Sequence, residues 1–150
     1  MWISDKYNLN RFISLQPPYS LVKRAEFERE LEALCLDQGI GLIPYSPLQA
    51  GFLTGKYRRD TIPNSVRAEG LKKFFTEANF ALIDLLEERG KPYGASVAQM
   101  ALAWLLQRPV MTAPIIGANT TAQLEDILGS LNVHLTPEDV EAIDKASNWK

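Results

Sequence analysis

The sequence predicts an α/β fold in which three parallel strands are covered by helices. Three short apolar segments that end in polar or glycine-containing tips support this prediction, at 12–19, 41–48 and 113–120. Segments with helical periodicity separate them, and a strand–helix–strand alternation implies right-handed crossovers and parallel strands. Because the carboxyl ends of parallel strands meet at one edge of a sheet, we expect the three tips to form one shared site.

The first long helix is expected over 24–38, directly before the middle strand at 41–45. Its apolar stripe follows the i, i+4, i+7, i+8 spacing of a helix face that packs on a core, with Phe27, Leu31, Leu34 and Cys35. Gly39 is a typical stop signal for that helix. Cys35 has no nearby histidine, so we expect it to be a core residue rather than a nucleophile.

Residues 46–70 lose this periodicity and are rich in glycine, proline and basic side chains. We expect a long loop there, and loops of this length in compact domains are usually functional or disordered. A helix is then expected over 72–89, closing at Gly90.

The remaining helices carry clear start signals. Ser96-Val97-Ala98-Gln99 fits a capping box, and the helix that follows is apolar nearly all round, so it should be buried. The third strand, near 113–116, leads into a helix from about 121 to 131. Thr136-Pro137-Glu138-Asp139 starts a terminal helix with a threonine cap, proline in the first turn and acidic residues against the helix dipole.

Three parallel strands alone would leave two open edges and a partly covered apolar face. The first strand is followed by Gln16-Pro17-Pro18-Tyr19 rather than by the glycine-rich turn of a doubly wound domain. The sequence therefore predicts part of a (β/α)8 barrel, a fold whose typical length is about 250 residues.

Composition narrows the function classes. The 150-residue chain has a net charge of −2, which gives no bulk attraction to nucleic acid or to anionic membranes. It has no apolar run of the ~18 residues that a membrane span needs, and no signal-peptide pattern. A single cysteine excludes an internal disulfide and fits a reducing cytoplasm, so we expect a cytoplasmic protein. No residues have metal-ligand spacing, and the lone His134 lies far from the strand tips.

Several motifs, in order along nearly the whole chain, resemble the aldo-keto reductase family. LQPPYSL at 15–21 is similar to the sixth barrel strand of that family, and IPYSPL with GFLTGKY, over 43–57, to the seventh strand and its cofactor loop. AQMALAWLL at 98–106 and PIIGA at 114–118 are similar to the helix before the eighth strand and to that strand. The resemblance implies that 1–150 is the C-terminal, NADP-binding portion of such a barrel.

The resemblance implies specific cofactor roles. Gln16 would bind the nicotinamide carboxamide, and Tyr45 would stack on the nicotinamide ring. The pyrophosphate would be lined by Ser46, Pro47, Leu48, Gln49 and Ala50. Lys56 and Arg67 would supply cations to phosphates, including the 2′-phosphate of NADP(H). The adenosine side would be closed by Gly117, Asn119, Gln123 and Asp126.

The chemistry of these side chains agrees with those roles. A planar amide ligand needs a paired donor and acceptor, which glutamine provides. Phosphates favour helix N-termini and charge-assisted partners, and the helix near Thr121 has free N–H groups at its start. One departure is Ile127, where the family often has asparagine, which puts one adenine hydrogen bond in doubt.

Other interpretations stay open for these residues. Tyr45 could be an aromatic at a strand end, Gln16 could bridge neighbouring loops, and Lys56 and Arg67 could belong to a solvated loop face. Tyr19 is expected to be a packing residue. Glu138 and Asp139 are expected to be caps.

The family's catalytic Asp, Tyr, Lys and His motifs do not occur in this chain. We therefore expect an oxidoreductase portion, inactive alone, that would act on a small carbonyl substrate if completed by the missing half. The alternative is a non-catalytic interaction or regulatory protein, similar to channel β-subunits of the same family, that self-associates or complements another chain. A fragment without independent function is a third reading.

Overall fold

The sheet of the described residues consists of two short parallel strands, β1 (Ser14–Leu15) and β2 (Gly41–Leu42). The computed structural model describes residues 2–63 and 68–149. Ser14 pairs with Gly41, and Leu15 pairs with Leu42. The predicted α/β class and the parallel pairing of the first two strands are confirmed. Both strands are shorter than expected, since the prolines that follow them have no N–H to donate to a ladder.

The third predicted strand, near 113–116, is not a strand in the described part of the chain. The segment before and through it nevertheless runs beside β2. The amide of Leu42 donates to the carbonyl of Val110 at 2.9 Å, and that of Ile115 donates to the carbonyl of Pro44 at 2.8 Å. The carbonyl of Leu42 accepts from both Thr112 and Ala113. This doubled bond and the missing N–H of Pro114 break the regular ladder.

Gly41 allows the close approach of this third segment. A Cβ built on Gly41 would lie 2.3 Å from Oγ1 of Thr112. Any larger residue would therefore force the Thr112 hydroxyl out of this position.

The helix predicted over 24–38 is two helices, α2 (Ala25–Glu28) and α3 (Leu31–Gln38). The break falls at Glu30, whose φ of −138° lies outside the helical region. The predicted stripe is correspondingly incomplete, because Phe27 and Cys35 are buried whereas Leu34 is 47% exposed. Gly39 ends α3 in the left-handed conformation, as expected.

The region expected to be a loop over 46–70 contains the 3-10 helix η1 (Gln49–Thr54) and the start of α4 (Ala68–Leu71). The helix expected from 72 begins later, because η2 (Lys72–Phe74) ends at an extended bend before α5 (Glu77–Gly90). Thr76 is the cap of α5, and its hydroxyl accepts the amide of Asn79.

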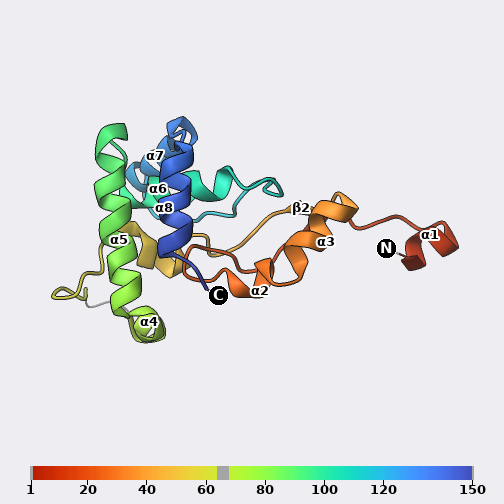
Figure 1. The fold of residues 1–150 in the computed structure, drawn as a ribbon, viewed down its shortest axis with the longest axis horizontal. Coiled ribbons are helices and arrows are strands. Elements are labelled where there is room, and N and C mark those ends of the chain that lie inside the picture. The colour runs from red at the N-terminus through yellow and green to blue at the C-terminus, as the bar shows by residue number, and fades with distance from the viewer. Residues whose placement is uncertain (1, 64–67, 150) are drawn as a thin grey trace.

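Helix α6 (Val97–Leu106) lies in the helical body and contacts α5, which also contacts α8 (Figure 1). Both hydrogen bonds of the predicted capping box, between Ser96 and Gln99, are present. Eight of the ten residues of α6 are buried. The chain continues through η3 (Lys91–Tyr93) before α6, and through α7 (Thr121–Leu128), η4 (Gly129–Asn132) and α8 (Pro137–Ala146) after it. The predicted Thr136 cap of α8 is confirmed.

Asp139 does more than cap α8. Its carboxylate accepts from Tyr93 and from Arg89 Nη1, the latter at 3.0 Å, so it also joins α8 to α5 and η3. These hydrogen bonds outweigh the opposing effect of burial and lower the pKa of Asp139.

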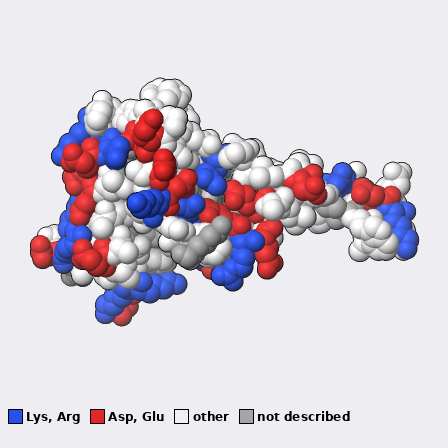
Figure 2. All heavy atoms as spheres, in the orientation of Figure 1, with Lys and Arg blue, Asp and Glu red and all other residues white. Residues whose placement is uncertain are grey.

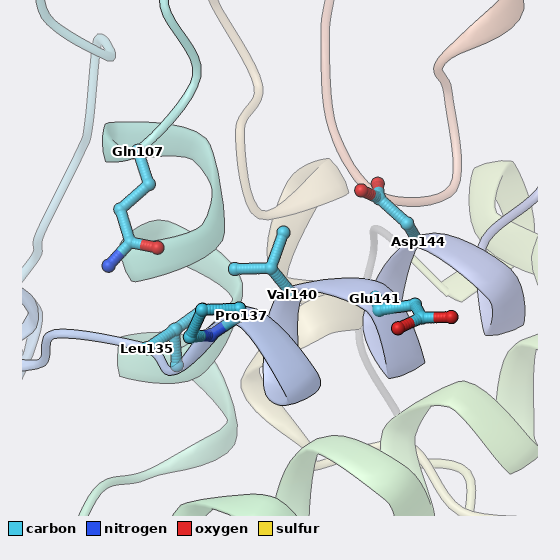
Figure 3. Close-up of a pocket in the computed structure, with 6 residues that line it drawn as sticks. All are labelled: Gln107, Leu135, Pro137, Val140, Glu141 and Asp144. Atoms are coloured by element: carbon cyan, nitrogen blue, oxygen red, sulfur yellow. The ribbon is translucent and has the colours of Figure 1, made fainter.

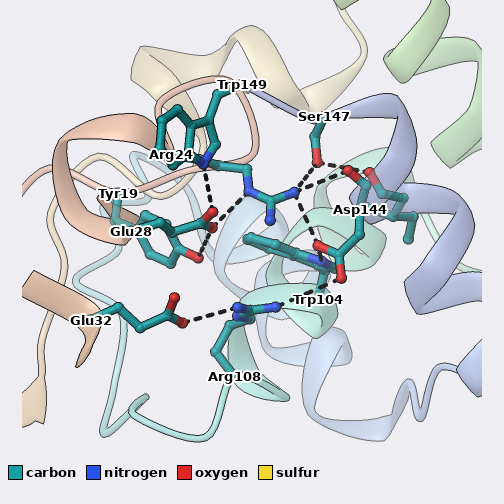
Figure 4. A network of polar contacts seen from close by, with 10 residues as sticks. Tyr19, Arg24, Glu28, Glu32, Trp104, Arg108, Asp144, Ser147 and Trp149 are labelled. Carbon is teal, nitrogen blue, oxygen red and sulfur yellow. Dashed lines mark hydrogen bonds and ion pairs between the residues drawn. The ribbon is translucent and has the colours of Figure 1, made fainter. Parts of the chain in front are cut away.

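A buried polar network ties the chain after α8 to α2 (Figure 4). Arg24, 8% exposed, donates from Nε to Glu28 and from Nη1 to Ser147, each at 2.7 Å. Tyr19 and Trp149 also donate to the Glu28 carboxylate, at 2.7 Å each. Tyr19 is thus a packing residue, as expected, that also has a buried hydrogen-bond partner.

The N-terminal helix α1 (Trp2–Tyr7) and the segment after it extend away from the helical body (Figure 1). We call residues 2–13 the N-terminal arm. Its large apolar side chains are at least 57% exposed, namely Trp2, Ile3, Tyr7, Leu9, Phe12 and Ile13. Over the body, Figure 2 shows acidic and basic side chains interspersed rather than segregated, as the net charge of −2 suggests.

Candidate functional site

A cavity of about 550 Å³ lies where three separate segments of the chain meet. The segment after β2 supplies one wall, residues 115–119 supply a second, and α7 with the first turn of α6 supplies the rest. Its lining residues are Ser46, Pro47, Leu48, Ala50, Gly51, Thr54, Lys56, Ala98, Ile115, Ile116, Gly117, Ala118, Asn119, Gln123, Asp126 and Ile127. The expected convergence of the second and third tips is therefore observed.

The wall after β2 has an unusual backbone. Ser46, Gln49 and Ala50 have φ values of 55°, 47° and 51°, and Gly51 follows at 90°. Non-glycine residues rarely adopt this left-handed conformation, and such strain gathers at ligand sites. Successive turns of this kind can direct backbone N–H groups toward one concavity, which suits an anion.

Lys56 is the basic residue of this wall. Its Nζ would lie 3.2 Å from a Cβ built on Gly51, so the absence of a side chain there lets the lysine lie across the turn. The ammonium is also 5.2 Å from the centroid of the Tyr57 ring. The side chain is exposed and at the cavity, which leaves its charge accessible to a ligand.

Another part of the cavity lining is the start of α7. Thr120 is its cap, with a hydroxyl that accepts the amide of Gln123, and the side chain of Gln123 accepts the amide of Asn119 at 2.9 Å. These two bonds order the turn between 119 and 123 at the cavity. The positive end of the helix dipole is therefore near the space in which an anion would lie.

Asp126 stands one turn further along α7 and contacts α6. Its carboxylate accepts from the Ser96 hydroxyl at 3.3 Å, and its backbone carbonyl accepts from Gln99 Nε2 at 2.8 Å. Beside it Ile127 is buried, so the aliphatic residue at this position packs against the body.

Nine of the predicted site residues line the cavity. Gln16, Tyr45 and Gln49 do not line it. Tyr45 is 45% exposed, and its amide donates to the carbonyl of Pro17 at 3.1 Å, so the tips that carry Tyr45 and Gln16 are neighbours. Gln49 accepts the Ser20 hydroxyl at 3.2 Å. Arg67 lies outside the described residues.

The sequence reasoning missed several lining residues, mostly small or aliphatic ones: Gly51, Thr54, Ala98, Ile115, Ile116, Ala118 and Ile127. Gly51 and Thr54 lie in the motif 51–57, and their position in a glycine-containing loop could have indicated that they line a ligand site. Nothing in the sequence indicates this for Ala98, because an alanine in an apolar helix does not reveal whether it faces a cavity.

A second hollow, of about 460 Å³, lies between the end of α6 and α8 (Figure 3). It is lined by Gln107, Leu135, Pro137, Val140, Glu141 and Asp144, and it holds none of the predicted site residues. Across the described residues, no three His, Cys, Asp or Glu side chains gather as a metal site would require. In the same part of the chain, no helix has the length and apolarity to cross a membrane.

Comparison with known proteins connects this arrangement to one family. The family model "Aldo/keto reductase family" matches residues 2–148. Versiconal hemiacetal acetate reductase of Aspergillus parasiticus is 36% identical over 148 residues, which cover 95% of this chain and 42% of the reductase. A probable voltage-gated potassium channel subunit beta of Arabidopsis thaliana is 34% identical, with 98% of this chain and 47% of the subunit covered.

A solved structure gives the same result at the level of the fold. The glycerol dehydrogenase of Gluconobacter oxydans superposes with a TM-score of 0.78 and 26% identity, over 96% of this chain and 45% of the dehydrogenase. The chain thus spans less than half the length of each of these three relatives.

Proposed function

Because the chain belongs to the aldo/keto reductase family, we propose that it is the NADP(H)-binding portion of an NADPH-dependent carbonyl or aldehyde oxidoreductase. The observation that carries this proposal is the cavity of about 550 Å³, which gathers predicted cofactor residues from two segments far apart in the sequence, 46–56 and 117–126. In the finer form of the proposal, residues 1–150 correspond to strands six to eight of a (β/α)8 barrel.

The donor set of the cavity suits a dinucleotide phosphate. It combines an accessible ammonium, a left-handed backbone turn and the start of a helix with apolar lining residues, Ile115 and Ile116. Charged groups and backbone amides bind phosphates, and apolar side chains accommodate the faces of ring systems.

At the nicotinamide end, we assign Tyr45 as the stacking platform and Gln16 as the partner of the carboxamide. Half-exposed aromatic side chains present a free face, and a glutamine amide supplies one donor and one acceptor. When bound, NADPH supplies the hydride for reduction of a carbonyl carbon. The residues of this chain hold and orient the cofactor.

At the phosphate and adenosine ends, we assign the pyrophosphate to the wall after β2, including Gln49, and the 2′-phosphate to Lys56 and Arg67. Asn119 and Gln123 stand at the start of α7, and Asp126 would meet the adenine amine. The cation, the turn and the helix start line one cavity, which supports this division.

Fluorescence titration of Trp104, Trp2 and Trp149 with NADPH and with NADH tests the proposal. We expect tighter binding of NADPH. Lys56→Met should weaken NADPH binding about five- to thirtyfold, since it removes a charge-assisted contact, while NADH binding changes little. Lys72→Met is the matched control, because Lys72 is an exposed lysine paired with Glu69. Equal affinity of the unaltered chain for both cofactors would contradict the roles of Lys56 and Arg67.

Catalysis by the isolated chain gives a separate test. The Asp, Tyr, Lys and His motifs that perform proton transfer in the family are absent from the sequence. We therefore expect no steady NADPH oxidation when the purified chain is mixed with small aldehydes. Sustained turnover would show that the chain has its own catalytic groups.

A second candidate is a non-catalytic interaction or regulatory protein, which the exposed apolar N-terminal arm and the similarity to a channel subunit favour. On this proposal, the arm and the open edge of β1 associate with another copy or with a complementary barrel segment. A carbonyl substrate would then bind only in the completed assembly.

A further inference from the structure

Gln99 joins α6 to the wall of the cavity through both ends of its carboxamide. Its Oε1 accepts the backbone amide of Ser96 at 3.0 Å, which completes the capping box of α6. Its Nε2 donates to the backbone carbonyl of Asp126 at 2.8 Å. The carboxamide provides both the acceptor and the donor, whereas a carboxylate of the same length has no donor.

The neighbouring glycine gives independent support for this contact. A Cβ built on Gly129 would lie 2.3 Å from Nε2 of Gln99 and 3.1 Å from its Cδ. The chain after α7 therefore passes so close to the amide that a methyl group there would displace it. Ser96 adds a second link, since its hydroxyl donates to the Asp126 carboxylate at 3.3 Å.

Helix α7 needs such links because little packing holds it. It has eight residues, and Ile127 is the one among them that is buried. A helix this short is unstable by itself in water. Its position must therefore depend on its caps and on the few bonds that tie it to the body.

We propose that Gln99 is a positioning residue for the cavity: acting through Asp126, it sets where α7 stands and so where Gln123 and Asp126 meet a ligand. The inference rests on the proposed function in one respect, namely that the ligand at α7 is the adenosine end of NADP(H). The positioning of α7 itself can be measured without any ligand.

Gln99→Glu is the sharpest test. Glutamate retains an oxygen for the amide of Ser96, so the capping box is kept, but it has no donor for the carbonyl of Asp126. Gly129→Ala disturbs the same hydrogen bond between Gln99 and Asp126, because the added methyl group displaces the Gln99 amide. Thr76→Ala is the control, since it removes a cap of α5 and leaves α7 untouched.

Hydrogen exchange of the ligand-free chain is the first measurement. We expect the amides of α7 to exchange about five- to tenfold faster in Gln99→Glu and in Gly129→Ala, but not in Thr76→Ala. Unchanged exchange in α7, or α7 amides that already exchange freely in the unaltered chain, would overturn the inference.

Cofactor affinity is the second measurement, made with NADPH and with reduced nicotinamide mononucleotide, which lacks the adenosine half. Both variants should weaken NADPH binding about fivefold or more and leave the mononucleotide unchanged, as a general loss of structure would not. Equal weakening of both ligands, or none, would overturn the role toward the cofactor. If the unaltered chain binds neither ligand, the proposed function fails, and the exchange result alone decides whether Gln99 positions α7.

Discussion

Arg24 and Glu28 show how single residues hold this chain together. Their ion pair, 2.7 Å long, has both side chains at most 9% exposed. Asp144, Ser147, Tyr19 and Trp149 supply further partners, so the pair is compensated on every side (Figure 4). Burial alone would raise the pKa of Glu28, but the hydrogen bonds from Arg24, Tyr19 and Trp149 lower it instead.

Glu28→Gln should lower the free energy of unfolding by about 2–4 kcal/mol at pH 7, because it leaves the Arg24 charge buried with weaker compensation. The folded pKa of Glu28 lies below its ordinary 4.5, so its contribution is complete above that pH and is lost as the pH falls through the folded pKa. The difference between the two proteins should therefore shrink below pH 4.5. Urea denaturation at a series of pH values measures it, and a constant difference down to pH 3 would refute this assignment.

At the scale of elements, local signals in the sequence were sufficient where a helix depends on its own caps. Ser96 with Gln99 and Thr136 with Asp139 were predicted and are present. Local signals were insufficient at Glu30, where the backbone leaves the helical region and one predicted helix becomes two. A stripe of spaced apolar residues cannot reveal such a break, because its members can face the core from two helices as well as from one.

Gly39→Ala should destabilise the protein by about 1–2 kcal/mol, since Gly39 ends α3 with φ +65° and nothing lies within 4 Å of an added Cβ. The cost is thus purely conformational. Gly70→Ala is the matched control, because its Cβ also meets nothing but the residue lies within α4. Alanine there should be neutral or stabilising by up to about 1 kcal/mol. Thermal melts of both variants decide the matter, and equal effects would argue against the conformational explanation.

Thr136→Ala should cost about 1 kcal/mol, because it removes the cap that accepts the amide of Asp139. It also removes the hydroxyl that donates to the Asp139 carboxylate at 3.0 Å. Thr121→Ala, an exposed change at the start of α7, is the control. Guanidinium titrations followed by circular dichroism would measure both, and a Thr136→Ala curve that overlays the unaltered one would be inconsistent with the cap.

At the scale of the whole molecule, the chain has a helical body and an N-terminal arm that extends away from it (Figure 1), with large apolar side chains that are at least 57% exposed. Phe12 and Ile13 are 77% and 81% exposed beside β1. An apolar edge strand of this kind favours association with another polypeptide.

Replacing Phe12 and Ile13 together by serine should therefore reduce concentration-dependent association in sedimentation velocity runs, while the melting temperature changes by only a few degrees. Leu124→Ser is a control for exposed apolar area elsewhere, being 41% exposed on α7. If the chain sediments as a monomer at every concentration before and after the change, association through the arm is excluded.

The sequence by itself determined the family, the α/β class, the buried helix α6 and two of the segments that meet at the cavity. These features depend on local periodicity, caps and motif order, which can be read directly from the sequence. Only the tertiary structure decided that Gln16 and Tyr45 stand outside the lining, that the third segment joins β2 without becoming a strand, and that Gln99 supports α7. Each of these depends on which backbone groups meet across large sequence distances, and that is settled by packing rather than by any local signal.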